Sequence, residues 1–191
     1  MRLSILGSTR GTHLHTLVEA ISVGKLKASI EIVISNKPDA LILSVAKNYG
    51  LKTFSIKAEN LSREDFDAKL ATALSEYDFD LIVLIGYMRI LSPTFVQHWR
   101  HKIINIHPSL LPAFEGKMDL AVHKAVLEAK VPETGCTVHY VTDEVDRGPA
   151  VLQKKCKILQ DDTPETLKAR VQELEGLALI EAIDLLSKNL A

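Results

Sequence analysis

An amide and an imidazole stand two residues apart where an apolar run ends, as Asn105 and His107. If the run is a β-strand, its side chains alternate between faces, so Asn105 and His107 point one way while Ile104 and Ile106 point the other. Pro108 cannot continue a strand ladder and ends the run directly after the histidine. An amide NH2 beside a titratable ring can stabilise an oxyanion and move a proton near neutral pH, which favours acyl-type chemistry. The spacing also fits an asparagine that caps a turn and a surface histidine, so both interpretations stay open at this point.

A loop rich in carboxylates supplies a second candidate group. Asp143, Glu144 and Asp146 lie within four positions, just before the Gly148-Pro149 turn. Carboxylates this close repel one another unless water or a cation screens them, and a protonated histidine would serve as that cation. A solvated acidic turn is the other interpretation of the same residues.

The first glycine loop has the residues of an anion site. An apolar run over residues 3–6 leads into this loop, and a helical pattern follows it. At such a turn, backbone N–H groups and the helix N-terminus attract phosphate, which would sit on Gly11, Thr12 and His13. Neither GxGxxG nor a Walker motif is present, so dinucleotide or Walker-type binding is not predicted. A turn that only connects two elements would have the same residues.

Apolar runs typical of strands alternate with helical patterns through the first 107 residues. The predicted strands cover residues 3–6, 30–34, 52–56 and 81–85, and a further strand is predicted in the apolar run that contains Asn105 and His107. One intervening helix opens with a capping box at Ser62, and another is capped by Ser92 before a proline. This alternation predicts a three-layer α/β fold with a doubly wound, mostly parallel sheet. Residues 134–141 and 150–158 follow as a hairpin-like pair, so an antiparallel C-terminal portion is expected.

The strand at residues 81–85 is apolar on both faces, as the centre of a parallel sheet requires. In open parallel sheets ligands bind beyond the carboxyl ends of strands, so the segment Met88–Leu91 is a candidate pocket wall. Its apolar side chains also fit an ordinary core.

Two helices are expected after the histidine motif. The first, over residues 119–129, places His123 on a half-exposed face, and the second opens with Thr163-Pro164. An apolar stripe on the second helix leaves Gln172 and Glu175 together on another face, where an exposed pair would only solvate the helix. The stripe consists of Leu167, Val171, Leu174, Ala178, Ala182 and Leu185.

The length, net charge and cysteine content of the chain limit the classes of protein to which it can belong. Its 191 residues fit a single domain over residues 1–191, and a net charge of −1 gives no argument for a nucleic-acid partner. The strand-like start leaves no room for a signal peptide and no run approaches a membrane span, so a cytoplasmic location without membrane contact is expected. Cys136 and Cys156 form no CxxC pair and are expected to be buried, reduced thiols. No set of ligands has zinc spacing, so no metal is expected.

Three motifs, taken together, resemble one family. They are Asn105-x-His107-Pro108-Ser109-Leu110-Leu111-Pro112, Gly135-Cys136-Thr137-Val138-His139 and Asp146-Arg147-Gly148-Pro149. From the first glycine loop to the last helix, the chain is similar to the phosphoribosylglycinamide formyltransferases, folate-dependent enzymes of de novo purine biosynthesis. The resemblance implies a Rossmann-like formyltransferase fold. It also implies that a formyl group passes from the co-substrate 10-formyltetrahydrofolate to the amine of glycinamide ribonucleotide, by direct attack through a tetrahedral intermediate and without a metal.

The resemblance also implies residue roles. Asn105, His107 and Asp146 match the catalytic trio of the family. The ribonucleotide site is matched by Gly11, Thr12, His13, Gln172 and Glu175. The folate site is matched by Arg63, Met88, Arg89, Ile90, Leu91, Asn105, Thr142, Asp143, Glu144, Val145 and Asp146. The expected partners are these small molecules, and a monomer and a homodimer both stay open.

The chain departs from the family pattern in two places. His13 stands where many members have asparagine, and the segment Glu115–Asp119 is longer and more acidic than in some members. Related activities are formylation of methionyl-tRNA and hydrolysis of 10-formyltetrahydrofolate, but these enzymes usually have an additional domain. A non-catalytic folate- or nucleotide-binding module is the alternative from another class, and the complete trio argues against it.

Overall fold

The computed structural model describes residues 1–58 and 60–188. These residues form two compact units, the first running from Met1 to Asn105 and the second beginning at Ile106. The boundary falls inside the strand β5 (Ile103–His107), between Asn105 and His107. The single domain over residues 1–191 therefore stays a prediction.

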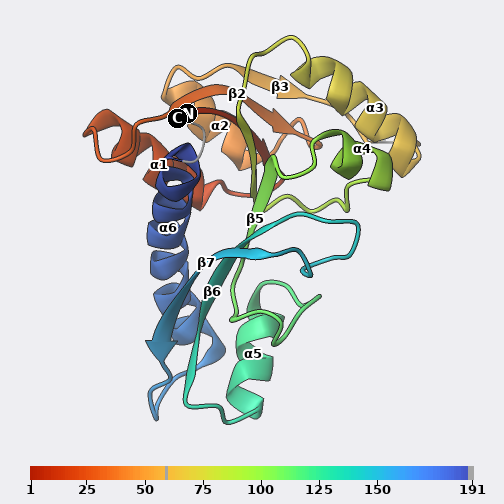
Figure 1. Cartoon of the computed structure of the whole chain (residues 1–191). Coiled ribbons are helices and arrows are strands. Elements are labelled where there is room, and N and C mark those ends of the chain that lie inside the picture. The colour runs from red at the N-terminus through yellow and green to blue at the C-terminus, as the bar shows by residue number, and fades with distance from the viewer. Residues whose placement is uncertain (59, 189–191) are drawn as a thin grey trace. The chain divides into compact units, whose positions relative to one another are not determined.

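The first unit is built on a parallel sheet (Figure 1). Its strands β1 (Arg2–Gly7), β2 (Ser29–Ser35), β3 (Thr53–Ser55) and β4 (Leu81–Ile85) lie with β5 in the order β3-β2-β1-β4-β5. Every neighbouring pair in this order is parallel. All five residues of β4 are buried, as a central strand requires.

Helices connect these strands on both faces of the sheet. They are α1 (Thr12–Ser22), α2 (Leu41–Asn48), α3 (Arg63–Leu74) and α4 (Pro93–His98). Contacts join α1 to α2 and α3 to α4. Because the chain moves from β1 toward β3 and then from β4 toward β5, right-handed crossovers place the two helix pairs on opposite faces. The predicted doubly wound parallel sheet is confirmed.

The predicted helix starts in the first unit are also confirmed. Ser62 Oγ accepts a hydrogen bond from the Asp65 amide at 3.0 Å, and Ser92 Oγ accepts one from the Phe95 amide at 3.3 Å. Each satisfies an N–H group that a helix start leaves without an intrahelical partner. The second of these caps fixes the point at which the chain after β4 becomes helical.

The second unit combines two helices with an antiparallel strand pair. After the end of β5 come α5 (Leu120–Glu128), β6 (Glu133–Tyr140), β7 (Ala150–Lys157) and α6 (Pro164–Lys188). The strands β6 and β7 pair antiparallel, and α6 packs on both of them and on α5. The expected antiparallel C-terminal portion is confirmed.

The predicted stripe of α6 is confirmed at Leu167, Val171, Ala178 and Ala182 and is wrong at Leu174 and Leu185. Leu174 is only half-buried and Leu185 is 41% exposed, whereas Glu175, predicted to be exposed, is buried. Gln172 is half-buried. The helix keeps its 3.6-residue period, so the buried positions continue from Val171 through residues 175, 178, 179, 182 and 183.

Two smaller predictions also need correction. His123 is 2% exposed rather than half-exposed, because α5 buries Val122, His123 and Val126 and packs against α6. Cys136 on β6 is buried as expected, but Cys156 is only half-buried because β7 alternates between exposed and half-buried positions. Within residues 1–58 and 60–188, no helix combines the length and apolarity that a membrane crossing needs.

Candidate active site

The carboxylate of Asp146 lies between two buried imidazoles in the second unit. Its Oδ2 atom is 3.3 Å from Nδ1 of His107, and its Oδ1 atom is 3.7 Å from Nε2 of His139. The two histidines are 4% and 2% exposed. The predicted partnership between the acidic loop and an imidazole is therefore present, and it joins residues 39 positions apart in the sequence. His139 received no role from the sequence, where its only signal was its place in the Gly135–His139 motif.

Both ring nitrogens of His107 face oxygen atoms. Nε2 is 3.3 Å from the carbonyl oxygen of Phe114, and Nδ1 faces the carboxylate of Asp146. A carbonyl oxygen only accepts hydrogen bonds, and so does an ionised carboxylate. A doubly protonated ring satisfies both contacts, so this geometry suits an imidazolium paired with a carboxylate.

His139 has a different environment. Its Nδ1 atom lies 2.9 Å from the carbonyl oxygen of Tyr140, which makes Nδ1 the donor. Burial lowers the pKa of His139, while the Tyr140 carbonyl and the charge of Asp146 act in the opposite direction. The two imidazoles beside Asp146 thus differ. Both ring nitrogens of His107 face oxygen atoms, whereas burial favours the neutral form of His139.

The backbone holds Asp146 in an uncommon conformation. Its φ is 59°, in the left-handed region that non-glycine residues adopt at a cost. Two residues later, a Cβ on Gly148 would overlap the carbonyl group of Tyr140, so only glycine allows the loop to pass this close to β6. The amide of Gly116 also donates to Asp146 Oδ2 at 2.9 Å. The carboxylate therefore has a fixed position between its two imidazoles.

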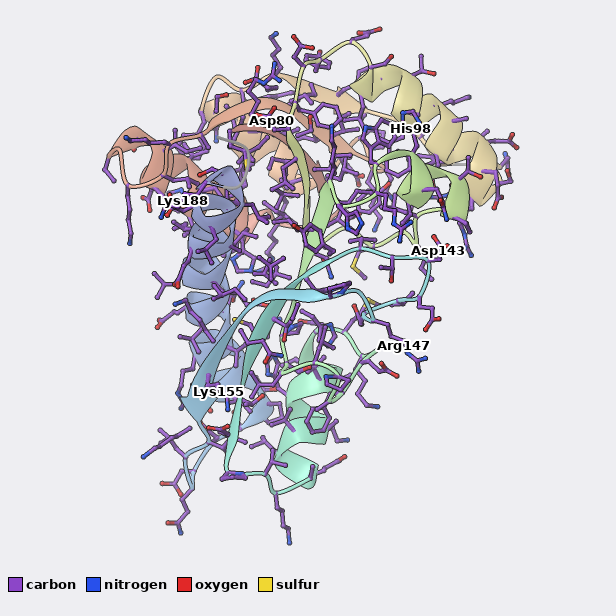
Figure 2. The ribbon with its side chains drawn as sticks, viewed as in Figure 1. Asp80, His98, Asp143, Arg147, Lys155 and Lys188 are labelled. Atoms are coloured by element: carbon purple, nitrogen blue, oxygen red, sulfur yellow. The ribbon has the colours of Figure 1, made fainter. Side chains whose placement is uncertain are left out.

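Arg147 joins the two loops that surround this carboxylate. Its guanidinium donates to Glu115 at 2.8 and 3.2 Å and to Glu144 at 3.1 Å. These hydrogen bonds from Arg147 hold the pKa of Glu115 below its usual range. Figure 2 places Arg147 on the same loop as Asp143. The acidic segment Glu115–Asp119 is thus tied at its first residue by Arg147, and its last residue pairs with Lys168.

Asn105 belongs to the first unit and lies two residues before His107 on β5. It is half-buried and stands in register with Leu84 of β4. Strand alternation gives Asn105 and His107 the same face of β5, as predicted. The amide and the imidazole are thus presented from one strand end.

The predicted phosphate loop occupies the point where the strand order of the first unit reverses. The loop after β1 contacts the segment after β4, since the Ser8 amide donates to the Gly86 carbonyl at 3.1 Å. Open α/β sheets bind ligands at such switch points. Gly11 has a φ of 74° and precedes the first residue of α1, and a Cβ there would lie 2.6 Å from Cγ1 of Ile42. This position therefore requires glycine.

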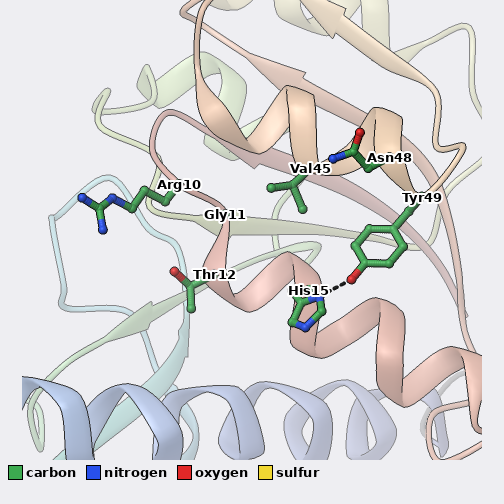
Figure 3. Close-up of a pocket in the computed structure, with 7 residues that line it drawn as sticks. All are labelled: Arg10, Gly11, Thr12, His15, Val45, Asn48 and Tyr49. Atoms are coloured by element: carbon green, nitrogen blue, oxygen red, sulfur yellow. Dashed lines mark hydrogen bonds between the residues drawn. The ribbon is translucent and has the colours of Figure 1, made fainter.

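A pocket of about 380 Å³ opens beside this loop (Figure 3). Of the three residues predicted to hold phosphate, Gly11 and Thr12 line it, whereas His13 is buried and does not. His15 lines the pocket instead, and Figure 3 shows its ring hydrogen-bonded to the hydroxyl of Tyr49. The remaining lining residues are Arg10, Val45, Asn48 and Tyr49.

The residues assigned to the folate by resemblance are divided between the units. In the first unit, Arg63 is exposed at the start of α3, and Met88 and Ile90 are 47% and 53% exposed while Leu91 is buried. The guanidinium of Arg89 turns inward onto the ring of Phe66. The loop from Thr142 to Asp146 belongs to the second unit.

Glu175, assigned to the ribonucleotide, has a buried partner that the sequence did not indicate. Burial lowers the pKa of His123, and the charge of Glu175 is the largest influence in the other direction. The contact between α5 and α6 thus brings an imidazole near this carboxylate. No cluster of three or more metal-ligating side chains occurs among residues 1–58 and 60–188, and the absence of a metal from the reaction stays a prediction.

Comparisons with known proteins identify the relatives of this chain. The family model described as formyl transferase matches residues 1–183. The phosphoribosylglycinamide formyltransferase of Escherichia coli is 40% identical over 176 residues, which is 92% of this chain and 82% of that protein. The trifunctional purine biosynthetic protein adenosine-3 of Gallus gallus is 42% identical over 99% of this chain, but the match spans only 19% of its own length.

Solved structures agree with these matches. The glycinamide ribonucleotide transformylase 1 of Symbiobacterium toebii has a TM-score of 0.92 at 37% identity, covering 99% of this chain and 88% of that one. The phosphoribosylglycinamide formyltransferase of Anaplasma phagocytophilum has a TM-score of 0.89 at 39% identity, with the same coverage. The fold expected from the resemblance is therefore confirmed.

Proposed function

This chain belongs to the formyl transferase family, and we propose that it transfers the formyl group of 10-formyltetrahydrofolate to the amine of glycinamide ribonucleotide in purine biosynthesis. Relatives named for this reaction match nearly the whole chain. The observation that carries the proposal is the Asp146 carboxylate 3.3 Å from His107, on whose strand Asn105 lies two residues earlier. These are the three groups that the chemistry needs.

The reaction begins with attack by the ribonucleotide amine on the formyl carbon. A new C–N bond forms, and the carbonyl oxygen gains negative charge in a tetrahedral intermediate. We assign the Asn105 amide and the Nε2–H of His107, which would exchange its Phe114 carbonyl acceptor for the substrate, to stabilise this oxygen. Their shared strand face supports this assignment, since both donors would approach the oxygen from one side.

The intermediate then collapses toward the product. The bond between the formyl carbon and N10 of the folate breaks, and the proton lost by the amine ends on N10. Asp146 faces Nδ1 of His107, and its position allows it to accept the amine proton through a water and return it toward N10. Holding both substrates side by side would contribute as much as these groups.

The remaining site residues are assigned to one or the other of the two substrates. We assign Gly11, Thr12 and His13 to the phosphate of the ribonucleotide, and Gln172 and Glu175 to the rest of that molecule. Arg63, the segment Met88–Leu91 and the loop Thr142–Asp146 are assigned to the folate. The pocket beside Gly11 and Thr12 supports the first assignment. A cytoplasmic location and the choice between monomer and homodimer stay predictions from the sequence.

A spectrophotometric assay tests the proposal directly. Purified protein is mixed with 10-formyltetrahydrofolate, with and without glycinamide ribonucleotide, and release of tetrahydrofolate is followed. Product that requires the ribonucleotide supports the transferase. Product without it would indicate a hydrolase, and no product at all would indicate a binding module, so either result would overturn the proposal.

A further inference from the structure

The segment Gly86–Ser92, which leads from β4 to α4, is held at both ends by side chains of other elements. Near its start, the Met88 amide donates to Ser8 Oγ at 2.9 Å, and Ser8 Oγ donates in turn to Asn36 Oδ1 at 2.5 Å. At its end, the Ser92 amide donates to Asp67 Oδ2 at 2.5 Å. The segment has no strand ladder of its own, so these side chains decide where its backbone lies.

Asp67 is an unexpected group at this position. It is 2% exposed on α3, and burial raises its pKa, against the influence of the Ser92 amide and of the charges of Arg89 and Arg63. A buried carboxylate is costly unless it is paired and hydrogen-bonded. No step of the proposed reaction uses it. Its Oδ2 atom accepts from the amide of Ser92, the residue that also caps α4, so Asp67 fixes both the end of the segment and the start of that helix.

The side chains of the segment point alternately inward and outward. Met88 and Ile90 are exposed, whereas Arg89 lies with its guanidinium carbon 4.2 Å from the ring centroid of Phe66, the neighbour of Asp67. The hydroxyl of Tyr87 is buried, and the charge of Asp67 adds to burial in raising the pKa of Tyr87. The inward side chains thus gather around Asp67, and the outward face of the segment is left for a ligand.

The inward cluster also contains unsatisfied polar atoms. In the part of the chain that the structure describes, Asp67 Oδ1, Tyr87 Oη and Arg89 Nε are buried without a hydrogen-bond partner. One is an acceptor and two can donate. Each buried polar atom without a hydrogen-bond partner destabilises the fold. Apolar side chains at these three positions would pack without that cost.

From these contacts we propose that Asp67 is a positioning residue for the formyl donor: together with Ser8, Tyr87 and Arg89 it holds the backbone of Met88–Leu91 in the conformation that binds the folate. The inference rests on the proposed function, because the folate assignment of this segment comes from it. Asp67 touches no substrate and acts only through the segment.

The test compares the two substrates in steady-state kinetics. Asp67→Ala removes the acceptor of the Ser92 amide, and we expect the KM for 10-formyltetrahydrofolate to rise about tenfold, the value of one charged hydrogen bond. The KM for the ribonucleotide should stay within about twofold. Asp67→Asn keeps an acceptor oxygen and should recover most of the folate affinity. Asp78→Asn, whose side chain is 94% exposed in the same unit, is the matched control.

Two further measurements separate the possible failures. Fluorescence titration with a non-reactive deaza analogue of the folate measures donor binding without turnover, and its Kd should rise in parallel with the KM. If Asp67→Ala does not fold, Asp67→Glu keeps the charge but moves the acceptor away from the Ser92 amide, and the same selective loss of donor binding is expected.

Equal changes in both KM values, or unchanged donor binding in a folded variant, would overturn the positioning role. Wild-type protein that neither binds the analogue nor turns over would instead refute the proposed function.

Discussion

Replacing Asp146 by asparagine removes the negative charge beside His107 while it keeps the size of the side chain. At 3.3 Å and an effective dielectric constant of about 20, two unit charges attract by about 5 kcal/mol. The asparagine side chain also has one acceptor oxygen where the carboxylate has two. It therefore cannot accept from the Gly116 amide and also present an acceptor to each of the two imidazoles. We therefore expect kcat to fall by about 10² to 10⁴, which corresponds to about 3 to 5 kcal/mol.

Initial rates at saturating concentrations of both substrates measure this loss. The variant should fold, because the substitution adds no volume. Circular dichroism and thermal unfolding check this. Asp161→Asn, at an exposed position of the same unit, makes the same chemical change away from the imidazoles and should keep the wild-type rate. A folded Asp146→Asn protein with kcat within about threefold of wild type would refute the assignment of His107 and Asp146 as a working pair.

Three other predictions follow from the second unit. Glu175→Ala should raise the KM for the ribonucleotide more than that for the folate in the same initial-rate assay, and equal rises would make Glu175 structural. Arg170 holds the pKa of Asp162 well below its usual range through two hydrogen bonds of 2.7 Å. A carboxyl whose pKa is lower in the folded state stabilises the fold at pH values above its unfolded pKa of about 3.9. This stabilisation is lost as the pH falls through the folded-state pKa. Asp162→Asn should therefore lose about 1 to 2 kcal/mol at pH 7 in urea unfolding, and this difference should shrink below pH 4; a difference that does not depend on pH would refute the linkage. Burial raises the pKa of the Cys136 thiol to about 12, so at pH 8 a disulfide reagent should modify half-buried Cys156 first, and equal rates would contradict this.

The fold could be predicted because its signals are local. Apolar runs, caps at Ser62 and Ser92, and the change from alternating helices to a hairpin each depend on a few neighbouring residues. The partnership of His107 with the acidic loop was also within reach, because repulsion among carboxylates creates a need for a cation. Charge spacing alone could not specify which of the three carboxylates meets the ring, and only the family resemblance indicated Asp146. That choice depends on the left-handed backbone of Asp146 and on the passage of Gly148 beside Tyr140.

Four buried polar residues were not predicted as such: His123 and Glu175 were expected on more exposed faces, and no placement was predicted for Asp67 and His139. Asp67, His123, His139 and Glu175 occupy inward positions of helices or strands, where polarity alone predicts exposure. Each is compensated by a group distant in the sequence, such as the Ser92 amide for Asp67 or Asp146 for His139. The hydrophobic periodicity of a helix or strand depends only on its own residues. It therefore cannot reveal a hydrogen-bond or charge partner that lies on another element.

Two carboxylates, Asp67 and Asp146, solve the same structural problem. A parallel strand ends in a loop whose amides have no ladder partner, and such loops carry the ligand site in this class of sheet. After β4, the loop's Ser92 amide is taken by Asp67, and after β5 the Gly116 amide is taken by Asp146. In both places a side chain from another element replaces the missing strand neighbour. Asp146 additionally faces two imidazoles, so in the proposed mechanism the carboxylate that accepts from Gly116 also supplies charge to the reaction, whereas the role proposed for Asp67 is only to position the segment. This difference predicts where each substitution acts: on kcat for Asp146 and on donor binding for Asp67.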